Sequence, residues 1–421
     1  MGNKKNVVVV GGGFAGVQFI KQLDQKLFNV TLLDKINHHQ FQPLFYQVAT
    51  SQLEPSSISF PFRKIFQKYD NVQIRLAEVT AVDPQVNTVH TSIGDFNYDY
   101  LIVAAGCKTN FFGNKLIEEN AYTLKSTSDS IALRNHILIN FEKIIYAPKE
   151  EQEALFNIVI VGGGPTGVEL AGAFAEIKKN ILPKDYPGID FSKLKIILIE
   201  GSPNTLNSMS DLAHSASRMY LEKMGVEIHT QLVVKNYDGK IAELSNGETI
   251  PTASLIWAAG VTTNSFEGFD ESVYGPGRRM KVDRTNLISG YKNVYAVGDI
   301  AYMETPKYPK GHPQLANVAI NQAKNVADNL KALQSNKSLK EFEYKDLGSM
   351  ATIGKNKAVV DLPFIKFKGF FAWLTWMFVH LMLILSVKNK LIIFINWAWA
   401  YITKDTSLRL ILTQKKVDSK Q

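Results

Sequence analysis

The sequence contains a single cysteine, Cys107, among 421 residues. One cysteine excludes an intrachain disulfide and a CxxC redox centre, and it is typical of a reducing compartment. An apolar leader is also missing, because MGNKKN leads directly into a strand-like run of four valines. We therefore expect the soluble part of the chain to stay in the cytoplasm.

The composition is neither that of a disordered protein nor that of an acidic one. A hydrophobic content of 45% and a charged content of 20% exclude a disordered or fibrous protein. The net charge is +8, and from Phe364 to Gln421 there are nine Lys or Arg against two Asp. A basic end of this kind indicates either nucleic acid or an anionic membrane surface as a partner. The apolar segments around it favour the membrane.

A glycine fingerprint follows a short strand near the N-terminus. Val7–Val10 is fully apolar, which is typical of a strand in a covered parallel sheet, and Gly11-x-Gly13-x-x-Gly16 then leads into a helix. In such a turn the first glycine allows a tight bend, the second lets the backbone approach a pyrophosphate, and the third lets helix and strand pack closely. Asp34, 18 residues after Gly16, ends the next strand and can accept hydrogen bonds from ribose hydroxyls.

The same fingerprint occurs a second time, as Gly162-x-Gly164-x-x-Gly167. Its strand–turn–helix–strand unit ends at Glu200, and no Arg or Lys lies within the ten residues after it. A carboxylate at this place repels a 2′-phosphate, so we expect NADH rather than NADPH. Two dinucleotide sites on one chain indicate one tightly held flavin and one exchangeable nicotinamide.

Two further apolar strands, YDYLIVAAG and TASLIWAAG, end in small residues that let the backbone approach a ligand. The pattern predicts an α/β fold of two Rossmann-like dinucleotide-binding domains, with the second inserted in the first. A C-terminal helical membrane-anchoring region completes the predicted architecture.

Taken in order, several segments resemble one family: VVVVGGGFAG, FQPLFYQVAT, YDYLIVAAG, IVIVGGGPTGVELAG, LIWAAGV, NVYAVGDIA and the tryptophan-rich end. The resemblance is to the type II NADH dehydrogenases, the non-proton-pumping NADH:quinone oxidoreductases among the flavoproteins with two dinucleotide-binding domains. It covers almost the whole chain. It implies hydride transfer from NADH to tightly, non-covalently bound FAD, and then electron transfer to menaquinone or ubiquinone in a respiratory chain.

The missing signal peptide, the basic end and the duplicated unit, together with the resemblance, indicate where the protein acts and how the chain divides. We expect a monotopic homodimer on the cytoplasmic face of the cell inner membrane, with membrane lipid and quinone as partners and no nucleic acid. The expected domains are an FAD-binding domain at residues 1–118 and 265–335, an NADH-binding domain at 119–264 and the membrane-anchoring region at 336–421.

Roles for individual residues follow from the same resemblance. Glu169 matches the family's carboxylate beside the nicotinamide, and its place just after the turn directs it back toward the ligand end of the helix. Gln47 lies in the segment Tyr46–Thr50, expected beside the isoalloxazine, and we take Glu169 and Gln47 as the catalytic residues. The residues expected at FAD are Gly11, Gly13, Phe14, Ala15, Gly16, Asp34, Lys35, Ala105, Gly106, Asp299 and Ala316. Those expected at NADH are Gly162, Gly164, Pro165, Thr166, Gly167, Glu200, Ala259 and Gly260.

The expected quinone site departs from the family pattern. Family members carry two glutamines in A-Q-x-A-x-Q, whereas this chain reads ANVAIN, with Asn317 and Asn321 in those places. Asparagine keeps the amide but is one methylene shorter, and the following Gln322 is a candidate to compensate. Lys390 resembles a position that reaches the quinone, although a lysine that extends to lipid headgroups is an equal interpretation.

The single cysteine also bears on related protein classes. Disulfide reductases and sulfide:quinone reductases need redox cysteines, which Cys107 alone does not supply. A soluble-acceptor NADH oxidase or diaphorase, or a flavin redox sensor that docks on membranes, are the alternatives. His38 and His39 lack a second cluster of ligands, so we expect no metal site.

The C-terminal end carries two apolar runs, Gly369–Val387 and Leu391–Ile402, separated by KNK. As one helix the first run would span roughly 28 Å, which is borderline for crossing a bilayer. The second run is too short to return. Flanking lysines and four of the five tryptophans favour an anchor that lies in one leaflet.

Overall fold

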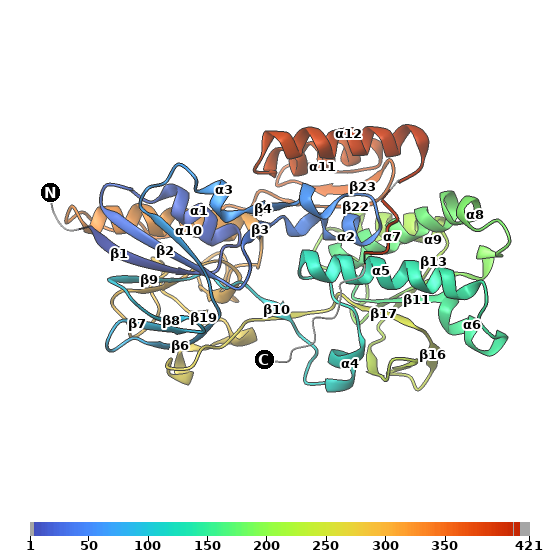
Figure 1. Cartoon of the computed structure of the whole chain (residues 1–421), viewed down its shortest axis with the longest axis horizontal. Helices are drawn as coiled ribbons and strands as arrows, with labels where there is room; N and C mark the ends of the chain where they lie inside the picture. Colours follow the sequence, from blue (N-terminus) through green and yellow to red (C-terminus); the bar gives the residue numbers. More distant parts are fainter. Residues whose placement is uncertain (1–3, 407, 413–421) are drawn as a thin grey trace. The chain divides into compact units, whose positions relative to one another are not determined.

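The computed structural model describes residues 4–406 and 408–412, which form two compact units (Figure 1). The first unit holds the described residues up to Gln40, then Phe60–Lys108 and Val261–Lys345. The second unit holds Phe41–Ser59, Thr109–Gly260 and the described residues from Asp346 onward. Each unit contains its own parallel sheet.

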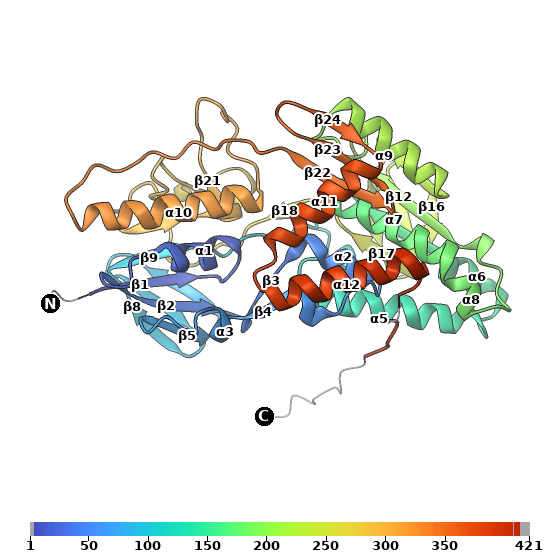
Figure 2. The ribbon, with the colours of Figure 1, turned by 90° about the horizontal axis from the view of Figure 1, so that it is seen from above.

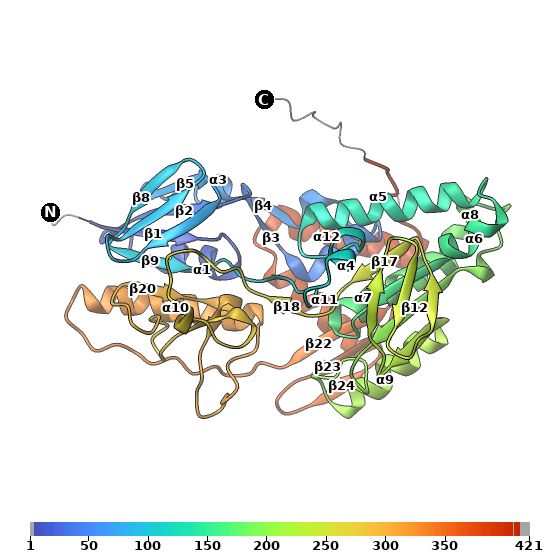
Figure 3. The ribbon, with the colours of Figure 1, turned by 90° about the horizontal axis from the view of Figure 1, so that it is seen from below.

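The first unit contains a five-stranded parallel sheet in the order β20–β9–β1–β2–β5 (Figure 3). Its strands are β1 (Lys5–Val10), β2 (Phe28–Asp34), β5 (Val72–Leu76), β9 (Tyr100–Val103) and β20 (Val294–Ala296). Side chains alternate between the faces of a strand, so Val7 and Val9 pack into one core while Val8 and Val10 pack into another. The sheet is therefore covered on both faces, as the continuous apolar run predicts.

Two helices cover the face that carries Val7 and Val9. They are α1 (Phe14–Gln22) and α10 (Ala316–Leu333), which contact each other. Residues of an antiparallel sheet pack against the opposite face. The remaining strands and helices of this unit are β3 (His38–Gln40), α3 (Phe62–Ile65), β6 (Val79–Asp83), β7 (Thr88–Thr91), β8 (Gly94–Asn97), β18 (Val261–Thr262), β19 (Met280–Lys281) and β21 (Ala301–Tyr302). At junctions along the chain lie β4 (Ser59–Pro61) and β10 (Lys108–Thr109).

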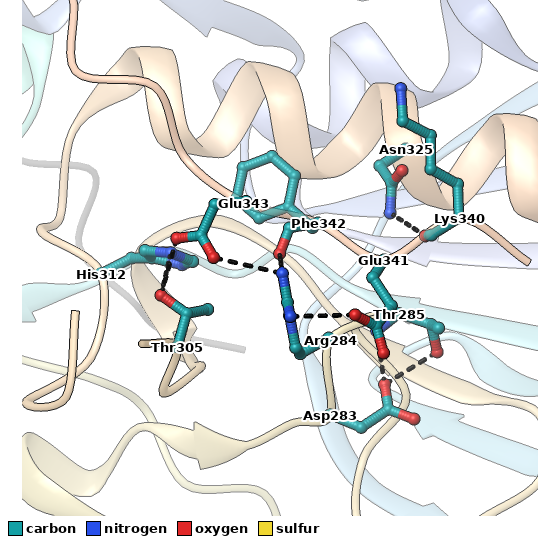
Figure 4. Close-up of polar contacts among 10 residues, drawn as sticks. All are labelled: Asp283, Arg284, Thr285, Thr305, His312, Asn325, Lys340, Glu341, Phe342 and Glu343. Atoms are coloured by element: carbon teal, nitrogen blue, oxygen red, sulfur yellow. Dashed lines mark hydrogen bonds and ion pairs between the residues drawn. The ribbon is translucent and has the colours of Figure 1, made fainter. Parts of the chain in front are cut away.

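The segment that follows α10 is held to the first unit by Arg284 (Figure 4). The guanidinium nitrogens of Arg284 lie 2.9 Å from a carboxylate oxygen of Glu341 and 3.1 Å from one of Glu343. The hydroxyl of Thr305 donates to the other carboxylate oxygen of Glu343 at 2.9 Å. These groups are partly exposed, so each pair contributes little on its own, but together they fix the path of residues 341–343.

The second unit contains a four-stranded parallel sheet in the order β13–β12–β11–β17. The strands are β11 (Asn157–Val161), β12 (Lys195–Glu200), β13 (Val226–Thr230) and β17 (Ser254–Trp257). An antiparallel sheet is formed by β14 (Val234–Tyr237), β15 (Ile241–Leu244) and β16 (Thr249–Pro251). The helices are α2 (Phe45–Ala49), α4 (Lys115–Asn120), α5 (Thr127–Ile144), α6 (Lys149–Phe156), α7 (Pro165–Asn180), α8 (Leu182–Asp185) and α9 (Asp211–Lys223).

A further antiparallel sheet of the second unit lies against α7. It consists of β22 (Ser349–Gly354), β23 (Lys357–Asp361) and β24 (Lys366–Lys368). A Cβ atom at Gly172 of α7 would collide with the carbonyl oxygen of Ile353 in β22. The glycine therefore permits helix and strand to lie close together, and this places the residues of β22 beside the middle of α7.

The first C-terminal apolar run does not form one continuous helix. Helix α11 (Phe370–Leu383) ends before Ile384, which is extended, and α12 (Val387–Thr403) takes in the KNK segment (Figure 2). The Asn389 side-chain amide, in the first turn of α12, donates to the carbonyl oxygens of Ser56 and Ser57. The 14 residues of α11 span about 21 Å. Throughout residues 4–406 and 408–412, no helix combines the length and the apolar character needed to cross a membrane.

Candidate active site

The first glycine turn joins β1 to α1 and has the geometry of a phosphate cradle. Gly11 has φ of +101°, and a Cβ there would lie 2.5 Å from the carbonyl oxygen of Ala104. A Cβ at Gly16 would collide with the carbonyl oxygen of Gly11, so this glycine permits the close packing of helix and strand. By contrast, a Cβ at Gly13 would meet no atom within 4 Å. The turn is thus open at the N-terminal end of α1, where backbone N–H groups and the helix dipole favour an anion.

The acid at the end of β2 closes this turn from the side. One carboxylate oxygen of Asp34 accepts from the backbone N–H of Gly12 at 2.6 Å, and the other accepts from Ile36 at 2.9 Å. Burial raises the pKa of Asp34, while these N–H groups lower it. Lys35 is exposed, and its ammonium group pairs with Glu78 at 2.5 Å. Asp34 is therefore placed beside the turn, and Lys35 is turned to a surface carboxylate.

Three further segments of the first unit come together near α1. Asp299 follows β20 at a turn where Gly298 has φ of +78°, and a Cβ at Gly298 would lie within 3.4 Å of Ala15 and Ala319. The backbone N–H of Gly298 donates to Oε1 of Gln322 at 2.8 Å. The Cys107 thiol donates to a carboxylate oxygen of Asp299 at 3.1 Å. The predicted FAD residues Ala15, Asp299 and Ala316 therefore belong to neighbouring segments.

Gln322, which we considered as a compensating residue at the quinone, is fully buried, and its Oε1 accepts from the backbone N–H of Gly298. Its Nε2 has no hydrogen-bond partner in the part of the chain that the structure describes. A buried donor without a partner fits a group supplied by a bound cofactor. The first unit therefore has features that suit FAD.

The second glycine turn, between β11 and α7, repeats the geometry of the first. Gly162 has φ of +110°, a Cβ at Gly167 would collide with the carbonyl oxygen of Gly162, and a Cβ at Gly164 would meet nothing within 4 Å. Glu200 accepts from the backbone N–H groups of Gly163 at 2.5 Å and Ser202 at 2.6 Å. Pro165 and Thr166, in the first turn of α7, are exposed. These features suit a second dinucleotide.

Small residues follow the neighbouring strands in both units, as the sequence predicts. Ala105 and Gly106 come after β9, and Ala259 and Gly260 come after β17, with φ of +63° at Gly106 and +72° at Gly260. In a parallel sheet the carboxyl ends of adjacent strands share one edge. These residues therefore lie at the same edge of their sheet as the glycine turn of their unit.

Glu169 lies on α7 and is buried, with an exposed fraction of 8%. Burial raises its pKa to about 8, and the backbone N–H of Thr352, 3.4 Å from Oε1, lowers it in part. The nearby indole of Trp376 lowers the pKa further, although its N–H does not make a full hydrogen bond. A carboxyl group with this pKa carries its proton at neutral pH and can donate it.

Gln47 lies on α2 with its amide fixed on both sides. Its Nε2 donates to the hydroxyl of Tyr46 at 2.8 Å, and its Oε1 accepts from the indole N–H of Trp397 at 2.8 Å. Gln47 and Tyr46 are both buried. The orientation of the amide is thus set by a side chain from α12, 350 residues further along the chain.

Gln47 and Glu169 line the same cavity in the second unit, and its volume is about 110 Å³. Aromatic side chains form much of the remaining wall: Tyr46, Trp373, Trp376, Trp397 and Tyr401. The structure therefore brings together the two residues that we took as catalytic. Sequence reasoning missed the tryptophans as parts of this wall, although the presence of four of the five near the C-terminus was a signal.

The three residues expected at the quinone are not part of the lining of this cavity. Lys390 does not line this cavity, and its ammonium group donates to the carbonyl oxygen of Met382 at 2.9 Å, near the end of α11. Asn317 and Asn321 lie in the first two turns of α10 and are half-buried. The Asn321 side chain donates to the carbonyl oxygen of Asn317 at 2.8 Å, so one of its amide hydrogens is used within the helix.

Comparison with known proteins bears on this geometry. Residues 5–323 match the family model of pyridine nucleotide-disulphide oxidoreductases, and residues 347–404 match the NDH2 C-terminal domain. The chain is 34% identical over 420 residues to the type II NADH:quinone oxidoreductase Ndh of Mycobacterium tuberculosis, covering 95% of this chain and 89% of that protein. This chain belongs to the type II NADH:quinone oxidoreductases. The family predicted from the sequence is therefore confirmed.

Two other relatives extend the comparison. The type II NADH:quinone oxidoreductase of Staphylococcus aureus is 29% identical over 365 residues, covering 85% of this chain and 89% of that protein. The structure of NDH2 from Plasmodium falciparum in complex with NADH has a TM-score of 0.90 at 22% identity, covering 98% of this chain and all of that one. At this identity the likeness concerns the fold, and it confirms the predicted α/β architecture.

Proposed function

We infer that this chain oxidises NADH and delivers the electrons to a quinone, with FAD as its bound cofactor and without pumping protons. Membership of the type II NADH:quinone oxidoreductases supports this function, and the two open glycine turns suit the two dinucleotides. FAD, when bound, supplies the chemistry that accepts a hydride and passes electrons on. The protein's own residues would bind the cofactor and NADH, orient the reacting ring and supply a proton for quinone reduction.

We propose that the first unit holds FAD. The open face at Gly13 and the N-terminal end of α1 would receive the pyrophosphate, and Asp34 would accept from the ribose. Asp299 and the unpartnered Nε2 of Gln322 would serve the remainder of the cofactor. The other residues proposed at FAD are Gly11, Phe14, Ala15, Gly16, Lys35, Ala105, Gly106 and Ala316.

The second unit would bind NADH at the turn that Glu200 closes. We propose that Gly164 and the exposed first turn of α7 receive the pyrophosphate. The carboxylate of Glu200 would accept from a ribose hydroxyl and repel a 2′-phosphate. Gly162, Pro165, Thr166, Gly167, Ala259 and Gly260 complete this proposed site.

Glu169 has the central chemical role in this proposal. Quinone reduction by NADH takes up one proton, and Glu169 is a buried carboxyl group that holds a proton at neutral pH in a cavity lined by Gln47 and aromatic rings. We propose that it supplies this proton while Gln47, fixed by Tyr46 and Trp397, orients the reacting ring. Asn317, Asn321 and Lys390 remain proposed quinone residues.

Membrane attachment is proposed from the exposed surface of α11 and α12. These helices and the turn between them expose a set of large apolar side chains: Phe370, Phe371, Leu374, Phe378, Met382, Leu383, Leu385, Val387, Leu391, Phe394, Ile395, Trp399 and Ile402. Such a patch marks a lipid or protein contact. We propose that it lies in one leaflet on the cytoplasmic face, and that the protein is a homodimer. Of the basic segment SLRLILTQKK, which we expected to attract anionic lipid, Ser407 and the residues beyond Leu412 lie outside the described residues.

The function is tested by the oxidation of NADH and of NADPH by the detergent-solubilised protein, with a menaquinone analogue and with oxygen alone. We expect rapid oxidation that depends on the quinone and is at least about tenfold faster with NADH than with NADPH. A Glu200→Gln variant should lose part of this preference, since it removes the charge that repels the 2′-phosphate. Reduction of the flavin by NADH without reoxidation by the quinone would contradict the proposed acceptor.

A further inference from the structure

A second and larger cavity of the second unit lies beside the C-terminal end of α12, with a volume of about 660 Å³. Five lysines line it: Lys179, Lys223, Lys355, Lys357 and Lys404. Only two acids are part of the same wall, Glu176 and Asp405. The lysines come from α7, α9, the β22–β23 hairpin and the end of α12. Four different parts of the chain thus bring positive charge to one space.

The two acids do not neutralise this charge. Asp405 is paired with Arg409, whose nitrogen lies 2.8 Å from Oδ1. Glu176 accepts from the backbone N–H of Lys355 at 2.5 Å, and burial raises its pKa, while Lys355 and Lys357 lower it in part. The cavity therefore keeps a positive excess at neutral pH.

The five lysines differ in how their ammonium groups are used. Lys355 donates to the carbonyl oxygen of Tyr401 and lies 3.8 Å from the centre of its ring, and Lys357 donates to the carbonyl oxygen of Lys355. In the described part of the chain, the ammonium groups of Lys179, Lys223 and Lys404 make no hydrogen bond and no ion pair. The positively charged lysines around this cavity repel one another. A bound anion would relieve this repulsion and would therefore be stabilised. Lysine ammonium groups suit phosphate oxygens well.

The surroundings of the cavity indicate where the phosphate comes from. Ala400, Tyr401 and Lys404 of α12 and its C-terminal end line the cavity, while Trp399 and Ile402 of the same turn are exposed by 61% and 79%. One turn of helix thus borders a cationic cavity and also belongs to the apolar patch of α11 and α12. A ligand that matches both has an anionic head and apolar chains, whereas a soluble phosphate matches only the cavity.

We propose that this cavity binds the phosphate headgroup of an anionic phospholipid whose acyl chains lie along the exposed apolar residues of α12. The proposal rests on the membrane attachment inferred above and adds a defined headgroup site to it. It makes Lys179, Lys223 and Lys404 the residues that distinguish anionic from zwitterionic lipid.

The test is co-flotation of the full-length protein with vesicles of phosphatidylcholine alone and with vesicles of equal parts phosphatidylcholine and phosphatidylglycerol. The wild type should bind the anionic vesicles more strongly. The triple variant K179Q/K223Q/K404Q should lose this advantage, with partitioning weaker by about tenfold or more. Native mass spectrometry should show phosphatidylglycerol retained by the wild type and absent from the variant.

A matched control removes the same net charge elsewhere in the second unit. The variant K193Q/K195Q/K240Q changes three exposed lysines that do not line the cavity, and it should behave as the wild type does. Equal weakening in both triple variants would overturn the headgroup site, because general electrostatics would then explain the binding. Equal flotation of the wild type on both kinds of vesicle would overturn it too. Thermal stabilisation by inorganic phosphate that matches stabilisation by anionic vesicles would point to a soluble ligand instead.

Failure of the lipid site can be told apart from failure of the enzyme assignment. Flavin absorbance and NADH oxidation with a water-soluble quinone, both measured in detergent, do not depend on vesicles and should be unchanged in both triple variants. Absence of these signals in the wild type would count against the proposed function. A change in flotation without a change in these signals counts only for or against the headgroup site.

Discussion

The two glycine turns of the molecule are closely alike in their chemistry but lead into helices that differ. In each turn, the first glycine is in the left-handed region, the third cannot carry a side chain, and the middle one opens outward. In each, a carboxylate from the next strand accepts two backbone N–H groups, Asp34 from Gly12 and Ile36, Glu200 from Gly163 and Ser202. Two residues beyond the last glycine the likeness ends.

At that position α1 carries Gln18 and α7 carries Glu169. Gln18 is half-buried, whereas Glu169 is buried in a cavity with aromatic walls. The covering elements differ as well, since α1 contacts α10 while α7 contacts β22. The comparison teaches that the turns account only for the proposed dinucleotide binding. The proposed proton-carrying group comes from the helix after the turn, and its burial is set by the elements that cover that helix.

The largest effect on stability and flavin content should come from substituting two glycines of the first turn separately, one that permits close packing and one that leaves the turn open. Gly16→Ala places a methyl group against the carbonyl oxygen of Gly11, so the free energy of unfolding should fall by about 1–3 kcal/mol or more, and the flavin should be lost. Gly13→Ala meets no protein atom and should fold normally, yet hold FAD more weakly. Thermal unfolding and flavin absorbance of the purified variants measure both. Equal stability of the two variants would contradict the packing role of Gly16.

The second effect concerns Glu169 and pH. Its pKa is raised from 4.5 to about 8, so the free energy of unfolding of the wild type should fall as pH rises through this window. The slope from this one group is at most about 1.4 kcal/mol per pH unit. Glu169→Gln removes this slope, so the variant should gain stability relative to the wild type as pH rises from 5 to about 8.

The pH dependence of quinone reduction should also reflect the protonation of Glu169. Above a pH of about 8 the wild type loses the proton on Glu169, so quinone reduction should decline there. Glu169→Gln should be slow at every pH and lack this decline. A pH profile of the variant that keeps the wild-type limb would assign the proton to another group.

The smallest effect tests whether the turn or its cover sets the pKa. Gln18→Glu puts a carboxyl group at the equivalent place on α1, where the side chain is half-exposed. Stability should change by less than about 0.5 kcal/mol, because the new carboxylate reaches water. The pH dependence of unfolding should match that of the wild type. A new slope above pH 5 as steep as that of Glu169 would show that the glycine turn, and not burial beneath the covering elements, raises the pKa.

The features that could be predicted from the sequence are mostly local. A buried strand, a glycine turn, a helix and a terminal acid follow one another within a few dozen residues, so Gly11, Asp34, Gly162 and Glu200 were placed by spacing. The partner of Gln47 was not, because Trp397 lies 350 residues away and no local pattern connects them. The contacts of Asn389 with Ser56 and Ser57 were missed for the same reason, since 333 and 332 residues separate the partners.

Of the residues predicted from family resemblance, some line the candidate active-site cavity and others do not. Glu169 and Gln47 meet in one cavity, whereas Lys390 directs its ammonium group to the carbonyl oxygen of Met382. Resemblance identifies a position in the chain, but the hydrogen bonds of the side chain depend on neighbours that have their own sequence. The alignment of a residue is therefore weaker information than its contacts.

The hydrogen bond from Trp397 to Gln47 has a consequence for protein engineering. The helix that presents apolar side chains outward also supplies Trp397, and α11 supplies Trp373 and Trp376, to the inner wall of the cavity. Cutting the chain near residue 365 to obtain a soluble enzyme would therefore remove part of the active-site wall together with the attachment. A water-soluble form should instead keep both helices and exchange only outward residues such as Phe371, Phe394 and Ile402 for polar ones.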